Sequence, residues 1–255
     1  MGSEMCIRDS LVCVGTATQT EVEEQVDLMY SLIHQQVDAI VLVPIDSKAL
    51  VQPVVEAVRK GVPVINIDIR LDTQLLEQAG VEVAFVGPDN FAAAYEVGKL
   101  LDKKLRNEDK VAIIEGLTAA DNAQQRKRGF IKAIEEKGLR LVASEPADWE
   151  TEKAAEVFQA MWMRYPDLKA VYCSNDAMAL GVLQQMQEKN CYLPVVGFDN
   201  DAVMKEFLST GKLVATADIF SSQMAVRGIE FALDVLEGKI ENRGVHSTAY
   251  EIIKQ

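Results

Sequence analysis

The sequence predicts an α/β protein with two doubly wound, mainly parallel sheets. Apolar runs of strand length alternate with amphipathic stretches of ten or more residues along nearly the whole 255-residue chain. Such continuous apolar runs are typical of strands that helices bury on both faces. The length of the chain allows two lobes of about 100 to 150 residues each.

The first part of the chain contains four predicted strands. They are the runs LVCVGTA, AIVLVP, VPVINID and VAFVGPD. Helices are expected after Thr20, after Ser47 and from Phe91, where amphipathic patterns begin. The segment IRLDTQLLEQAGVE, between the third and fourth runs, lacks the pattern of a full crossover helix. A boundary between two lobes is therefore expected near it.

Five further strands are predicted in the rest of the chain. They are VAIIEG, LRLVASEPA, AVYCSND, LPVVGFD and VATADI, and they lead into amphipathic segments such as QQRKRGFIKAIEEKG. Thr20 and Glu23 have the spacing of a capping box, and Ser47 and Asp176 are placed to cap the helices that follow them. The glycines that end helical stretches, and so predict C-terminal caps, are Gly61, Gly138 and Gly211.

Composition argues against several classes of function. No run reaches the roughly 18 apolar residues of a membrane span, so no direct membrane insertion is expected. The net charge of −13 disfavours contact with a nucleic-acid backbone. Cys13, Cys173, Cys191 and the two histidines lack metal-site spacing, and no nucleotide-binding or nucleophile motif occurs. Neither a metal, a cofactor nor a catalytic residue is therefore expected.

The first ten residues do not fit the fold pattern. Met1 to Asp9 resemble, residue for residue, the translation of a transposase sequencing adaptor. We therefore expect residues 1–10 to be a non-native segment. On this interpretation the natural gene is cut at its 5′ end, and any signal peptide is lost with it.

Polar residues end several of the predicted strands. VPVINID ends at Asp68, AVYCSND at Asn175 and Asp176, and LPVVGFD at Asp199. Ligands of open parallel sheets bind outside the carboxyl ends of the strands. Carboxylates accept hydrogen bonds and amides both donate and accept, which suits a neutral polyhydroxyl ligand. Each of these residues could instead cap the next helix, and capping is the preferred interpretation for Asp176 and Asp89.

Five motifs together carry a family resemblance. They are VYCSNDAMALGVL, VVGFDND, AQQRKRGF, EPADWETEKA and GKLVATADIFSSQMAVRGIEFALDVLEGK. Over residues 11–255 the chain resembles the type I periplasmic sugar-binding proteins of ABC transporters, the ribose-binding group most of all. The resemblance implies two lobes joined by three crossing segments, near residues 88–90, 219–221 and 248–250.

The same resemblance implies how the chain divides between the lobes. The N-terminal lobe takes residues 11–88 plus 220–248 and is incomplete, because the first βα unit of the family's fold is missing. The C-terminal lobe takes residues 89–219 plus 249–255.

The resemblance also implies a ligand site. The residues that match polar sugar contacts of the family are Asp68, Arg126, Asn175 and Asp199. Trp149 matches an aromatic side chain that lies against the sugar ring, and Asn122 and Leu117 match positions that line the cleft. Arg126 could instead be a solvated helix charge, and Trp149 could serve only to anchor the start of a helix.

Three positions depart from the ribose binders. Val43, Ile69 and Ile219 stand where those proteins place an asparagine, an arginine and a glutamine. An apolar residue at such a position leaves a ribose hydroxyl unpaired. We therefore expect a different pentose, a hexose or a sugar alcohol, with Arg70 or Asp218 supplying substitute contacts.

The expected function is capture rather than catalysis. A solute-binding protein of this kind takes a monosaccharide or sugar alcohol into the cleft between its lobes and delivers it to an ABC permease. The parent protein is expected in the periplasm or cell envelope, as a monomer. One alternative is the effector-binding core of a lactose-repressor-type transcription regulator, which uses the same lobes. Another is a hydrolase, although it needs a nucleophile and a base that the sequence does not show.

Overall fold

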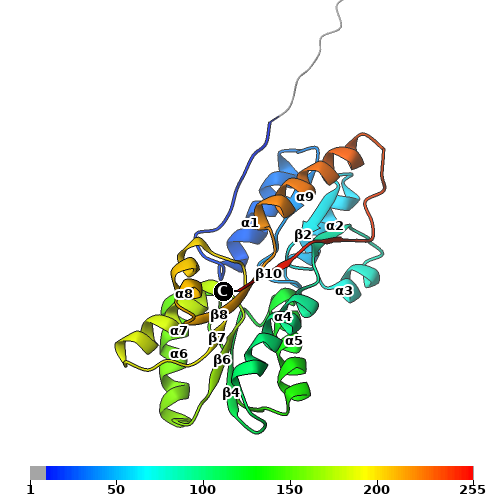
Figure 1. The fold of residues 1–255 in the computed structure, drawn as a ribbon. Helices are drawn as coiled ribbons and strands as arrows, with labels where there is room; N and C mark the ends of the chain where they lie inside the picture. The colour runs from blue at the N-terminus through cyan, green and yellow to red at the C-terminus, as the bar shows by residue number, and fades with distance from the viewer. Residues whose placement is uncertain (1–9, 255) are drawn as a thin grey trace, which may run out of the picture.

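The chain forms two α/β lobes that lie end to end (Figure 1). The computed structural model describes residues 10–254, so the adaptor-like residues 1–9 lie outside the described residues. One lobe contains a four-stranded sheet and the other a six-stranded sheet. All strand pairs in these sheets are parallel except the pair of β10 with β8. The predicted α/β class with parallel-dominated sheets is confirmed.

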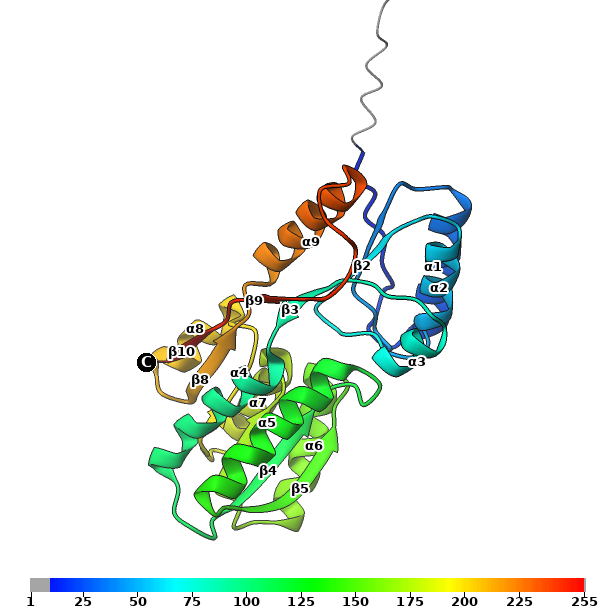
Figure 2. The ribbon, with the colours of Figure 1, turned by 90° about the vertical axis from the view of Figure 1, so that its right-hand side faces the viewer.

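The N-terminal lobe contains the four-stranded sheet, with the strand order β1-β2-β3-β9. Its strands are β1 (Ile40–Leu42), β2 (Val64–Ile67), β3 (Phe85–Pro88) and β9 (Val245–Thr248). Figure 2 shows α9 (Ser221–Leu236) on one side of this sheet. On the other side lie α1 (Val22–His34), α2 (Val51–Arg59) and α3 (Thr73–Gln78). All residues of β2 are buried, because helices cover both faces.

The C-terminal lobe contains the six-stranded sheet, with the strand order β10-β8-β7-β6-β4-β5. Its strands are β4 (Lys110–Glu115), β5 (Arg140–Pro146), β6 (Ala170–Cys173), β7 (Val195–Val196), β8 (Leu213–Asp218) and β10 (Glu251–Lys254). Its helices are α4 (Asn90–Gly98), α5 (Asp121–Lys137), α6 (Thr151–Arg164), α7 (Asp176–Glu188) and α8 (Lys205–Ser209), with short 3-10 turns at Lys99–Lys104 and Ala202–Met204.

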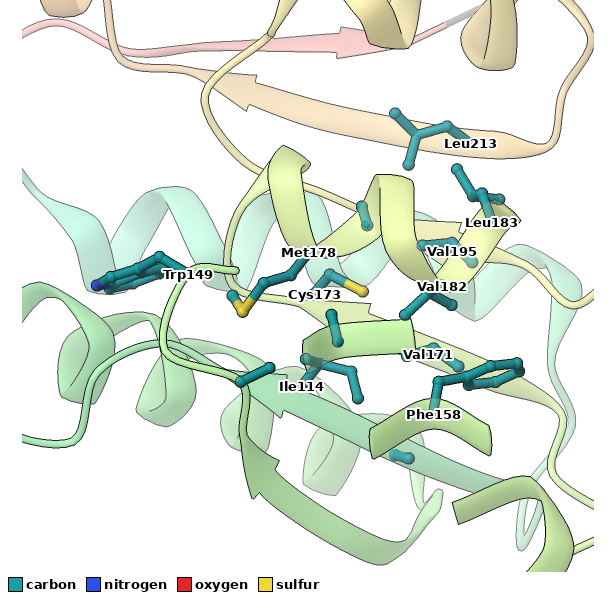
Figure 3. Packing of buried hydrophobic residues seen from close by; sticks show 14 of the residues in the cluster. Ile114, Trp149, Phe158, Val171, Cys173, Met178, Val182, Leu183, Val195 and Leu213 are labelled. Carbon is teal, nitrogen blue, oxygen red and sulfur yellow. The ribbon is translucent and has the colours of Figure 1, made fainter. Parts of the chain in front are cut away.

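Alternate residues of the central strands build the two halves of this lobe's core. Ala112 and Ile114 of β4 belong to the cluster with α6 and α7, whereas Val111 and Ile113 belong to the cluster with α4 and α5. Figure 3 shows the first cluster, which we call the α6–α7 cluster. Within residues 10–254, no helix combines the length and the apolar composition that a membrane crossing requires.

Three short connections join the two sheets. The chain passes from β3 to α4 at Asp89, from β8 to α9 through Ile219 and Phe220, and from β9 to β10 through residues 249–250. These connections lie at the crossing segments that the resemblance implies. The proposed lobe boundaries follow them.

The first predicted strand, LVCVGTA, is wrong. Residues 10–16 have no regular structure, and Leu11 and Val12 are 75% and 58% exposed. In the described part of the chain, β1 is an outer strand that pairs only with β2. An extended segment becomes a stable strand only when it pairs and buries one face, and this segment does neither.

Three predicted helix caps are also wrong. No side chain caps α1 or α2, so Thr20 and Ser47 do not have the predicted roles. Asn175 caps α7 in place of Asp176, because its side-chain oxygen accepts the Met178 N–H at 2.8 Å. A side chain can cap a helix only if its residue occupies the N-cap position. The path of the preceding strand and loop determines which residue that is.

The other predicted caps are confirmed. Asp89 caps α4 by accepting the Ala92 N–H at 2.9 Å. Gly138 ends α5 with a φ of 71°, a left-handed conformation that glycine adopts without strain. Gly61 and Gly211 also have positive φ just after α2 and α8.

Gly129 lets α5 pack closely against α4, and this generates a prediction. A Cβ at Gly129 would lie 2.4 Å from the Phe91 carbonyl oxygen and 2.8 Å from the Tyr95 nitrogen, both backbone atoms. We expect Gly129→Ala to lower the free energy of unfolding by about 1–3 kcal/mol, because the two helices must separate. Urea denaturation followed by circular dichroism measures this change.

The control is Gly15→Ala, since a Cβ at Gly15 meets nothing within 4 Å. We expect its unfolding midpoint to equal that of the unchanged protein. Equal midpoints for the Gly129 and Gly15 variants would contradict the prediction.

Candidate functional site

A cavity of about 200 Å³ lies where strand ends of the two sheets face each other. Six of the nine predicted site residues line it: Asp68, Asn122, Arg126, Trp149, Asn175 and Asp199. Its other lining residues are Gln19, Ile69, Asp201, Ile219 and Ser221. Pockets for drug-sized ligands span about 300–1,000 Å³, so this cavity suits a smaller molecule.

The direction of the strands explains why the lining residues meet. Asp68 follows β2, Asn175 follows β6 and Asp199 follows β7, so each lies beyond the carboxyl end of a parallel strand. Asn122 and Arg126 are four residues apart on α5, which places them on one face of that helix. Strand ends of both lobes and the start of one helix therefore supply the site.

Arg126 is buried at the floor of the cavity, with 3% of its surface exposed. Its Nε donates to Asn90 Oδ1 at 2.9 Å, and its Nη1 donates to the Ser174 carbonyl at 2.8 Å and to Asp199 Oδ1 at 3.3 Å. The guanidinium carbon also lies 3.7 Å from the centroid of the Phe198 ring. Arg126 is therefore not the solvated helix charge of the alternative interpretation.

The cavity has more acidic groups than its cation balances. Arg126 is the one cation among the described lining residues, and Asp199 pairs with it at 3.3 Å. Burial raises the pKa of Asp199 to about 8, and Arg126 offsets this only in part while Asp176, Asp68 and Asp201 add to it. Burial likewise raises the pKa of Asp68, against the opposing effect of Arg126. The lining thus combines one guanidinium with buried acids whose charged forms are disfavoured.

Three polar atoms at the cavity have no hydrogen-bond partner among the described residues. They are Asp68 Oδ1, Asn122 Oδ1 and Trp149 Nε1. Figure 3 shows Trp149 at the edge of the α6–α7 cluster, with its nitrogen turned away from the other labelled side chains. Trp149 thus packs on the core and also presents a donor outside it. Buried polar atoms require partners, and a ligand with hydroxyl groups can supply them.

The loops that carry these residues have unusual backbone conformations. Asp68, Trp149 and Asp199 have φ values of 62°, 68° and 105°. Residues other than glycine seldom adopt such values, and those that do are concentrated at functional sites. Their presence in one cavity supports its role as a binding site.

Asp176 holds the loop that carries Asp199. Its Oδ2 accepts the Asp201 N–H at 2.9 Å, and its Oδ1 accepts the Thr216 hydroxyl at 2.9 Å. The residue is fully buried, and burial raises its pKa to about 7 although these hydrogen bonds oppose the shift. The sequence-based assignment of Asp176 to capping is thus replaced by a positioning role.

Arg70, Leu117 and Asp218 do not line the cavity. The guanidinium carbon of Arg70 lies 5.5 Å from the ring centroid of Phe85, the first residue of β3. Leu117 packs against the α6–α7 cluster. Both carboxylate oxygens of Asp218 are engaged, since they accept the Phe220 N–H and the Asn200 amide at 2.8 Å each. Each of the three side chains therefore makes its described contacts within the protein, outside the cavity lining.

Sequence reasoning missed Gln19, Asp201 and Ser221. All three are exposed, which places them at the opening of the cavity. Asp201 had a signal, because it follows Asp199 in the polar end of VVGFDND. Gln19 precedes α1 and Ser221 begins α9, and no local pattern marks either as part of a site.

Ser47 of the N-terminal lobe binds the start of α5 in the other lobe. The residue before α5 is Ala120, which has no capping side chain. Ser47 Oγ accepts the Asp121 N–H at 2.9 Å, and the Ser47 N–H donates to the Ala119 carbonyl at 3.0 Å. These bonds connect the two lobes at the start of the helix that carries Arg126.

A family model described as a periplasmic binding protein domain matches residues 7–240. The chain belongs to the periplasmic binding protein family. The D-ribose/D-allose-binding protein of Pseudomonas aeruginosa is 41% identical to it over 251 residues, which are 96% of this chain and 79% of the relative. The D-allose-binding periplasmic protein of Escherichia coli is 32% identical over 225 residues, which are 86% of this chain and 72% of the relative.

Two solved structures of ABC transporter solute-binding proteins share the fold of this periplasmic binding protein. The one from Burkholderia multivorans, with an unknown ligand described as α-D-erythrofuranose, has a TM-score of 0.92 and 39% identity and covers 96% of this chain and 87% of its own. The one from Actinobacillus succinogenes, with bound D-allose, has a TM-score of 0.88 and 31% identity. The match covers 96% of this chain and 86% of that structure's chain. The predicted type I fold is confirmed.

The raised pKa of Asp199 predicts how the stability of this periplasmic binding protein depends on pH. The folded protein keeps a proton on Asp199 up to a pKa of about 8, whereas the reference value is 3.8. Its contribution to stability is therefore present at low pH and is lost as the pH rises from about 4 to 8. Asp199→Asn removes this loss, so we expect its Tm without ligand to fall less than that of the unchanged protein between pH 5 and 8.

The matched control is Asp27→Asn on the exposed face of α1. We expect its Tm to follow that of the unchanged protein across the same pH range in calorimetric scans. A fall for Asp199→Asn as steep as that of the unchanged protein would count against the prediction.

The Ser47 contact predicts an effect on the arrangement of the lobes. Ser47→Ala removes the acceptor of the Asp121 N–H, a bond with a net value of about 0.5–1.5 kcal/mol. We expect the population to shift toward more open lobes, with a larger radius of gyration in small-angle X-ray scattering. Ser31→Ala, on the exposed face of α1, is the control. Identical scattering from both variants would refute a bridging role for Ser47.

Proposed function

We propose that this periplasmic binding protein captures a small neutral monosaccharide or sugar alcohol in the cavity and delivers it, chemically unchanged, to an ABC permease. The observation that carries the proposal is the set of unpartnered polar atoms around a 200 Å³ cavity, namely Asp68 Oδ1, Asn122 Oδ1 and Trp149 Nε1. Hydroxyl groups donate and accept, so one polyhydroxyl ligand satisfies both kinds of atom.

Each proposed contact follows from the chemistry of the side chain. Asp68 and Asp199 accept hydrogen bonds from sugar hydroxyls, and Arg126 donates to sugar oxygens. Trp149 packs its ring against the C–H groups of the sugar. The amide side chains that complete the proposed set are Asn122 and Asn175. A carboxyl group that keeps its proton both donates and accepts, which suits the hydroxyls of a neutral ligand.

The relatives support capture for transport. Those described above are named for D-ribose and D-allose or for ABC transporter solute binding, and none is a transcription regulator. We therefore favour transport over the repressor alternative. The periplasm or cell envelope as the location of the parent protein, its monomeric state and its contact with a permease belong to the same proposal.

The proposal is tested by titrating monosaccharides and sugar alcohols into the protein in a calorimeter. We expect Arg126→Met to weaken the binding of the best ligand by a factor of about 30 or more, because it removes the buried charged donor proposed to bind the sugar oxygens. Arg128→Met on the same helix is the control, since Arg128 is exposed and outside the cavity. Its affinity is expected to stay unchanged. No binding of any sugar or polyol to the folded protein would overturn the proposal.

A further inference from the structure

The buried lining of the cavity contains two kinds of side chain. Asn122, Arg126 and Asn175 are polar and only 4%, 3% and 8% exposed. Ile69 and Ile219 are apolar and only 5% and 3% exposed. The cavity therefore offers a ligand both a hydrogen-bonding surface and an apolar surface, each shielded from water.

The two isoleucines come from different parts of the chain. Ile69 follows Asp68 at the end of β2, and Ile219 lies in the connection between β8 and α9. Both line a cavity of about 200 Å³ that also contains Arg126. In so small a space, a sugar ring that reaches Arg126 also meets the isoleucines.

Three polar groups beside the isoleucines are engaged within the protein or lie outside the cavity lining. The Ile69 carbonyl already accepts the Asn66 amide at 2.8 Å. Asp218, next to Ile219, uses both carboxylate oxygens within the protein, and Arg70, next to Ile69, does not line the cavity. A ligand hydroxyl that packs directly on either isoleucine side chain would lose its water and gain no hydrogen bond from that side chain.

We infer that the ligand presents an apolar edge to Ile69 and Ile219, and that the preferred class is a deoxy sugar. In such a sugar a methyl or methylene group stands where a related sugar carries a hydroxyl. This inference rests on the proposed function, sugar capture. A methyl group gains from burial at this surface, whereas a hydroxyl loses hydrogen bonds. One such group changes affinity by about tenfold to a hundredfold.

The first test uses the unchanged protein and matched pairs of sugars in a calorimeter. The pairs are D-fucose with D-galactose, L-rhamnose with L-mannose, 6-deoxy-D-allose with D-allose, and 2-deoxy-D-ribose with D-ribose. We expect the tightest ligand to be a deoxy sugar that binds at least tenfold more tightly than its hydroxylated partner. If the hydroxylated member of each pair binds equally or better, the inference is wrong and sugar capture stands. If no sugar binds, sugar capture itself fails.

The second test places a hydroxyl on the apolar surface. Ile69→Thr and Ile219→Thr each supply a partner for a ligand hydroxyl, so we expect the preference for the deoxy member to fall at least fivefold. The control is Ile252→Thr on β10, a half-buried isoleucine outside the cavity, which is expected to keep the full preference. The preference is a ratio within one variant, so a loss of overall stability does not change it.

An unchanged preference in both cavity variants would overturn the inference. Where a threonine variant does not melt cooperatively, Ile69→Val and the unchanged protein decide the question. The valine variant keeps the surface apolar, so it must retain the preference for the deoxy sugar.

Discussion

A buried guanidinium needs hydrogen-bond acceptors around it. The arrangement of the cavity depends on the acceptors that Arg126 requires. Its acceptors come from Asn90 at the start of α4, Ser174 after β6 and Asp199 after β7. Three separate elements must therefore be in place together. The same positive charge also acts on Asp68, so the influence of Arg126 extends to the N-terminal lobe. Loss of one acceptor would leave a donor of this buried charge without its partner.

Burial opposes the charged forms of the acids around Arg126. Asp199 and Asp68 have raised pKa values because burial disfavours their charged forms, and one cation serves both. Buried Asp176 nevertheless holds the loop of Asp199 in place. The strained φ values of Asp68, Trp149 and Asp199 belong to the same pattern. Local stability is given up at the site, and hydrogen bonds to a ligand can restore it.

Much of the fold could be predicted, because helix and strand periods are local properties of the sequence. The run VPVINID reads as a strand covered on both faces, and β2 is buried at every residue. The run LVCVGTA carries the same kind of signal, but it has no strand beside it and remains exposed. An apolar pattern indicates that a segment tends to form a strand. A strand also needs a neighbouring strand to pair with, and the local pattern does not specify that neighbour.

The sequence by itself determined most of the order of the elements, the acidic strand ends and the motifs that mark the family. Only the tertiary structure decided which of these residues meet. Arg126 and Asp199 are 73 positions apart and form an ion pair, and Ser47 binds Asp121 across the lobes. Asp218 and Arg70, which the sequence offered as substitute contacts, do not line the cavity. The physical reason is that hydrogen bonds and ion pairs depend on distances of a few ångströms, which periodicity along one segment does not encode.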